Sequence, residues 1–108
     1  MSKFVATFKM PQEKYDALKR IMDMDIIDFE KETVPYDAEI ESIREEFKNG
    51  ISIVWGMYTG QHNAWAEAFL VDKHGETVMD FYDNVMFDIT GAEIYYKGNT
   101  YILHIERE

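Results

Sequence analysis

Residues 51 to 82 read ISIVWGMYTGQHNAWAEAFLVDKHGETVMDFY and predict three consecutive antiparallel strands. Large apolar residues occupy every second position from residue 51 to residue 57, and a second alternating run covers residues 64–71. The loop of residues 59–62 joins these two runs as a hairpin. Gly75 can take the positive φ that a tight turn requires, so the third run follows directly in another hairpin.

The alternation assigns the side chains of these strands to two faces, because successive residues of a strand point to opposite sides of a sheet. The apolar face places alanines of the middle strand between larger residues, and it contains Ile51, Ile53, Trp55, Met57, Ala64, Ala66, Ala68, Leu70, Met79 and Phe81. The second face mixes aromatic and acidic groups and contains Ser52, Val54, Tyr58, Trp65, Glu67, Phe69, Val71, Val78, Asp80 and Tyr82. On this face Gly56 is expected opposite Trp65, so that a ring covers a strand glycine. We take the apolar face as the core, where the alanines leave a groove that a helix can enter.

Two helices are predicted outside this region. Pro11 favours a helix start, and the apolar spacing that follows predicts a helix over residues 11–22. Residues 23–36 are compatible with a continued helix, a strand or a loop. A second helix is predicted over residues 37–48, with Asp37 as N-cap, an apolar stripe of Ile40, Ile43 and Phe47, and Asn49-Gly50 as its end.

The remaining segments read as strands. Residues 2–10 alternate, with lysines on one side as suits an edge strand, and residues 83–91 can form a short extra strand. The last hairpin pairs residues 93–97 with residues 100–106 around a Gly98-Asn99 turn. Its alternation places Ile94, Tyr96, Tyr101, Leu103 and Ile105 on one apolar face. Together these elements predict an α+β fold, a largely antiparallel sheet of five or six strands with two helices packed on one face.

Length and composition narrow the class of protein. The chain has 108 residues, 46% of them hydrophobic, which predicts a single domain spanning residues 1–108. It has no cysteine, which excludes disulfides, a thiol nucleophile and cysteine zinc sites. The alternating N-terminus lacks the apolar run of a signal peptide, and no stretch approaches the roughly 20 apolar residues of a membrane span. We expect a cytoplasmic protein, either a monomer or a homodimer.

Four ionisable residues are the candidates for catalysis. Glu67, Asp80, Glu93 and His104 would share the second face, near Trp65, if both hairpin units join one sheet, with Glu93 opposite His104. Such a group can perform acid–base chemistry, and an aromatic wall of Tyr58, Trp65, Phe69 and Tyr82 can hold a small molecule. Acidic residues that alternate with apolar ones are more commonly a solvated sheet face. We therefore predict that the protein is not an enzyme.

The sequence predicts neither a metal site nor a cofactor. His62 and His74 fall in turns and His104 falls in the last strand, so their spacing is not that of a zinc or iron site. No glycine-rich phosphate loop, nucleophile elbow or nucleophile–base arrangement is present.

Acidic residues are concentrated in one segment. Residues 23–46 contain ten acidic and two basic residues, a balance of −8 in a chain of net charge −10. Such a field repels nucleic acid and attracts basic surfaces, although an acidic segment can also serve only as a solubilising surface. The predicted partner-binding residues are Asp28, Glu30, Glu32, Glu39, Glu41, Glu45 and Glu46.

This pattern predicts a small acidic protein that inhibits a basic partner, such as a nuclease or another nucleic-acid-binding protein, by copying the charge spacing of a nucleic-acid backbone. In size, acidity and lack of catalytic motifs the chain resembles the small inhibitors carried by phages and mobile elements. It equally resembles the immunity proteins that neutralise basic nuclease toxins. Both resemblances are compositional and involve no motif. The alternative function is small-molecule binding or catalysis on the aromatic and acidic sheet face, through Trp65, Glu67, Asp80 and His104.

Overall fold

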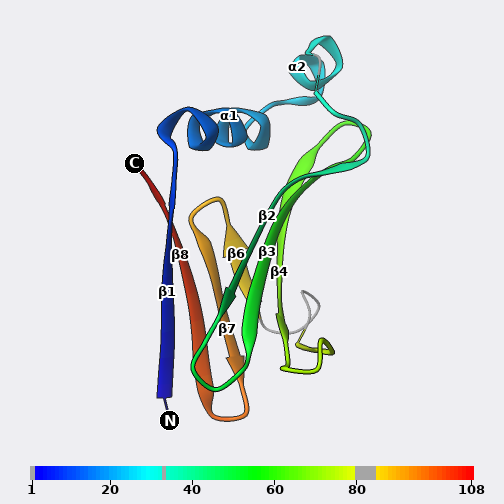
Figure 1. The fold of residues 1–108 in the computed structure, drawn as a ribbon. Coiled ribbons are helices and arrows are strands. Elements are labelled where there is room, and N and C mark those ends of the chain that lie inside the picture. Colours follow the sequence, from blue (N-terminus) through cyan, green and yellow to red (C-terminus); the bar gives the residue numbers. More distant parts are fainter. Residues whose placement is uncertain (1, 33, 80–84) are drawn as a thin grey trace.

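The computed structural model describes residues 2–32, 34–79 and 85–108, and of residues 85–87 it describes the backbone alone. In these ranges the chain forms β1 (Ser2–Met10), α1 (Gln12–Met22), α2 (Ile26–Lys31), β2 (Ala38–Glu46), β3 (Ser52–Thr59), β4 (Ala64–Val71), β5 (Thr77–Met79), β6 (Val85–Asp88), β7 (Gly91–Tyr96) and β8 (Asn99–Arg107). The predicted α+β class is confirmed (Figure 1).

The strands form two sheets, which corrects the prediction of one sheet with five or six strands. The central sheet has the order β2-β3-β4-β5, and the terminal sheet, which holds the first and last strands, has the order β1-β8-β7-β6. All neighbouring strands are antiparallel except β1 and β8, which run parallel. The two sheets pack face to face, so a second sheet rather than a pair of helices covers most of the predicted core face.

The predicted core face of the β3–β4 hairpin is confirmed. Ile53, Trp55 and Met57 are fully buried, and they pair with Leu70, Ala68 and Ala66 of β4. The terminal sheet contributes Ile94, Tyr101, Leu103 and Ile105, as their alternation predicted. Phe81, Tyr82 and Asp80 lie outside the described residues.

Both long hairpins turn at a position one residue away from the predicted one. The β3–β4 loop is residues 60–63, so Trp65 pairs with Tyr58 and not with Gly56. The β7–β8 turn is Lys97-Gly98, so Glu93 pairs with Ile102 and not with His104. Moving a hairpin turn by one residue changes each cross-strand partner by two residues, which leaves every side chain on its predicted face.

The predicted helix over residues 37–48 is wrong, because residues 38–46 form β2 at the edge of the central sheet. The stripe of Ile40, Ile43 and Phe47 has helical spacing, but a β-bulge between Glu39 and Glu41 accommodates Ile40 and leaves Ile43 and Phe47 in strand alternation. Pairing β2 with β3 satisfies the backbone groups along one side of β3, which an isolated helix would leave open. Gly50, with φ of 88°, closes the β2–β3 turn and does not end a helix.

The predicted helix over residues 11–22 is confirmed as α1, but it closes one end of the two sheets instead of lying on a sheet face (Figure 1). Leu18 is buried, and Tyr15, Ile21 and Met22 pack against the core. Residues 23–36, for which three conformations were open, contain the short helix α2. The Asp25 side chain caps α2 by accepting a hydrogen bond of 2.8 Å from the Asp28 backbone N–H. Over the described residues, neither helix has the length and apolar character needed to cross a bilayer.

The first prediction concerns Ala68, which pairs with Trp55 and is fully buried between the sheets. Ala68→Leu should lower the free energy of unfolding by about 1–3 kcal/mol, because the added methylenes must displace well-packed neighbours. Urea titration followed by circular dichroism measures this change. Ala17→Leu on the exposed side of α1 is the matched control and should stay within about 0.5 kcal/mol of the wild type. Equal stability of the two variants would contradict the assigned core face.

Candidate partner-binding surface

The seven predicted partner-binding carboxylates do not share one helix surface. Their segment passes from α2 through a connection into the edge strand β2 (Figure 1). The structure therefore divides them into groups with different surroundings, and two of the seven, Glu32 and Glu41, form ion pairs within the fold.

Two of the carboxylates point toward the core side of the central sheet. Glu41 and Glu45 pair with Met57 and Ile53, so they share a face with those buried residues. The Glu41 side chain is only 16% exposed, and its carboxylate lies 2.6 Å from Nζ of Lys14 in α1. A charge that points inward from an edge strand discourages another strand from pairing there, so Glu41 has a structural reason to be acidic.

Glu32 joins the end of α2 to α1. Its two carboxylate oxygens lie 3.0 and 3.4 Å from the Arg20 guanidinium nitrogens, which is a bidentate arrangement. The hydrogen bond from Arg20, together with its positive charge, lowers the pKa of Glu32, and the same contact raises the pKa of Arg20. Much of the Glu32 charge is thus offset within the chain.

The other four carboxylates face solvent. Asp28 and Glu30 lie on α2, and the Glu30 carboxylate is 3.5 Å from Nδ1 of His62 in the β3–β4 loop. Glu39 and Glu46 lie on the outer face of the central sheet, opposite Tyr58 and Ser52. None of these four forms an ion pair with a lysine or arginine among the described residues, so a partner can reach them without breaking one.

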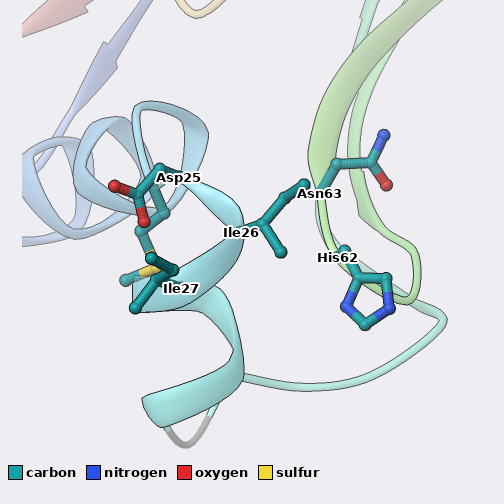
Figure 2. A pocket seen from close by; sticks show the side chains of 6 residues that line it. Asp25, Ile26, Ile27, His62 and Asn63 are labelled. Atoms are coloured by element: carbon teal, nitrogen blue, oxygen red, sulfur yellow. The ribbon is translucent and has the colours of Figure 1, made fainter.

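The structure adds two apolar residues that the analysis of charge missed. Ile26 and Ile27 at the start of α2 are 60% and 61% exposed. They line a hollow with Met24, Asp25, His62 and Asn63. Figure 2 shows Ile26 projecting from α2 toward the loop that carries His62 and Asn63. The available signal in the sequence was a pair of adjacent isoleucines in a segment too short and too acidic to bury both.

These isoleucines stay exposed because α2 has only six residues and the side that packs on the protein carries Phe29, which is 5% exposed. Tyr36, in the connection that follows, is also 63% exposed. Large apolar side chains that remain in water next to carboxylates are typical of surfaces that bind proteins. We name Met24, Ile26, Ile27, Asp28, Glu30 and His62 the α2 surface.

The four candidate residues for catalysis do not share one sheet face, which corrects the expectation that they would lie together if both hairpins joined one sheet. Glu67 lies on the outer face of β4 in the central sheet, whereas Glu93 and His104 lie on the outer face of the terminal sheet. The whole core separates these two faces. His104 pairs with Gly91, so it is not directly opposite Glu93 either. Asp80 lies outside the described residues.

A scan of protein-family models and searches of curated proteins and of solved structures found no significant match to this chain.

The second prediction tests the structural role of Glu41. Glu41→Lys should destabilise the fold by on the order of 1 kcal/mol, because it places two ammonium groups together at a position with little access to water. The change is measured by urea titration. Glu46→Lys on the exposed face is the matched control and should be nearly neutral. The charge swap Lys14→Glu/Glu41→Lys should recover most of the lost stability, and failure to recover it would contradict the ion pair.

Proposed function

We propose that this protein is a non-enzymatic, acidic binding protein that captures a basic protein and inhibits it, and that this partner is a nucleic-acid-processing protein such as a nuclease. The observation that carries the proposal is the α2 surface, where two isoleucines are 60% and 61% exposed beside Asp28 and Glu30. An inhibitor carried by a phage or mobile element and an immunity protein against a nuclease toxin would both act in this way.

The two kinds of side chain on the α2 surface have separate tasks. Desolvation of apolar side chains at the centre of an interface supplies most of the affinity. Carboxylates at the rim, together with a net charge of −10, accelerate the encounter with a positively charged partner. The surface therefore supports a partner with an apolar contact point surrounded by lysine or arginine.

The proposed contact set is narrower than the acidic segment as a whole. Asp28 and Glu30 belong to it with the isoleucines, and Glu39 and Glu46 extend it along the outer face of the central sheet. Glu32, Glu41 and Glu45 contribute to the electrostatic field, but Glu32 and Glu41 are held by ion pairs within the fold and Glu45 points to the core side of the sheet.

The third prediction distinguishes the effect of the carboxylates on the association rate from the effect of the isoleucines on the dissociation rate. A partner is captured from host lysate on the immobilised protein, identified by mass spectrometry, purified and measured by surface plasmon resonance. Asp28→Lys/Glu30→Lys should slow association about tenfold and weaken its dependence on salt. Ile26→Ser/Ile27→Ser should mainly accelerate dissociation, because it removes apolar contact and leaves the charge unchanged.

Glu93→Lys/Glu108→Lys is the matched control, since it changes the net charge equally and lies away from α2. It should have a much smaller effect on association than the α2 charge reversal. An acidic partner surface, or unchanged kinetics in both α2 variants, would contradict the proposed function. Inhibition is then tested by titrating the protein into an activity assay of the purified partner.

A further inference from the structure

The outer face of the central sheet carries two stacked aromatic rings outside the α2 surface. Tyr58 of β3 and Trp65 of β4 pair directly across the strands, with ring centroids 6.3 Å apart and ring planes inclined by 25°. Trp65 is 37% exposed, and Tyr58 is half-buried. Together they form an aromatic surface on this face, which we name the Tyr58–Trp65 platform.

Two glycines leave free the space that these rings occupy. A Cβ atom at position 56 would lie 2.7 Å from the Tyr58 hydroxyl oxygen, so the Tyr58 side chain occupies the space over Gly56. A Cβ atom at position 60 would lie 3.0 Å from the Trp65 ring, which rests against Gly60 in the same manner. The rings are therefore held in place before any ligand binds, which reduces the entropy lost on binding.

Carboxylates stand on both sides of the platform. Glu39 of β2 pairs with Tyr58, and Glu67 of β4 accepts a hydrogen bond of 3.0 Å from Trp65 Nε1. Burial raises the pKa of Tyr58, and the negative charges of Glu39 and Glu67 raise it further. In the described part of the chain, no lysine or arginine forms an ion pair with Glu39 or Glu67. Arg44 shares this face but pairs with Val54, which lies four residues before Tyr58 in β3.

We propose that the Tyr58–Trp65 platform binds an arginine side chain of a protein partner, with the guanidinium stacked on the rings and donating hydrogen bonds to Glu67 and Glu39. This proposal rests on the proposed function, because it assumes a basic protein partner and names one contact that this partner makes. A guanidinium is planar and weakly hydrated, so it can stack on a ring while its edge binds a carboxylate. Lysine is more strongly hydrated and lacks this planar fork. A nucleic acid would also stack, but its phosphates would be repelled by the carboxylates.

The fourth prediction uses two blocked peptides, acetyl-Gly-Arg-Gly-amide and acetyl-Gly-Lys-Gly-amide, added to the full-length protein labelled with ¹⁵N. The two tryptophan indole N–H signals report separately, because Trp55 is buried and Trp65 is at the surface. The arginine peptide should shift the Trp65 signal saturably and leave the Trp55 signal unchanged. The lysine peptide should bind at least about threefold more weakly.

Single-residue variants show which side chains bind the arginine peptide. Glu67→Gln should weaken binding of the arginine peptide about threefold or more, since it removes one charge-assisted acceptor. Glu93→Gln removes the same charge from the outer face of the terminal sheet and should have no effect. Trp65→Ala should abolish binding. Because this variant lacks the Trp65 indole, its binding is followed by the backbone N–H signals of Tyr58 and Glu67, and the unchanged Trp55 indole signal shows that it is folded.

Four outcomes would overturn the platform proposal. They are an equal response to both peptides, a response that Glu67→Gln leaves unchanged, a saturable response to a neutral sugar but not to the arginine peptide, and dimerisation of the free protein that buries Trp65.

Different results would refute the platform proposal and the proposed function. If the α2 variants lose partner binding and Trp65→Ala retains it, only the platform proposal is refuted. Arginine binding at Trp65 without any basic partner would refute the proposed function.

Discussion

Burial of Trp55 between the two sheets is the constraint on which the rest of the structure depends. The ring is fully buried, and its Nε1–H donates a hydrogen bond of 2.8 Å to the Asp88 carbonyl of β6 in the terminal sheet. An indole N–H left without an acceptor in the core would cost on the order of 1–3 kcal/mol, so this bond fixes β6 relative to β3. Ala68 and Ala66, which pair with Trp55 and Met57, provide the room that lets the second sheet approach.

An aromatic cluster closes another part of the core and links distant parts of the chain. Phe4 of β1 stacks on Tyr101 of β8 at 5.1 Å, and Phe47, just after β2, lies within 6 Å of both rings. The Tyr101 hydroxyl lies 2.9 Å from the Asn49 amide nitrogen, so the β2–β3 turn of the central sheet is held against the terminal sheet. The core is built from the inward apolar residues of both sheets, and the isoleucines of α2 and the Tyr58–Trp65 platform are not part of it. A role in binding therefore explains why these apolar side chains are exposed.

Much of the fold could be predicted because the hairpin patterns are local. The faces of β3, β4, β7 and β8 were predicted correctly even though each turn was displaced by one residue, since that displacement changes partners by two positions and preserves the face. The candidate site was predicted less well. The acidic residues could be listed from the sequence, but the ion pairs that make Glu32 and Glu41 structural involve Arg20 and Lys14 of α1. Contacts between segments so far apart in the chain leave no periodic signal.

By itself, the sequence determined the α+β class, the α1 helix, the inward face of each long hairpin and the concentration of negative charge, because side-chain periodicity and charge depend on residues close together in the chain. Tertiary structure alone decided that the strands divide into two sheets, that residues 38–46 pair with β3 as a strand, and that Glu67 is separated by the core from Glu93 and His104. The spacing of Ile40, Ile43 and Phe47 fits a helix as well as a bulged strand. Two factors favour the strand: β3 has a backbone edge that needs hydrogen-bond partners, and Ile43 is buried opposite Trp55. Both exist only in the assembled sheet, so the sequence of residues 38–46 alone does not reveal them.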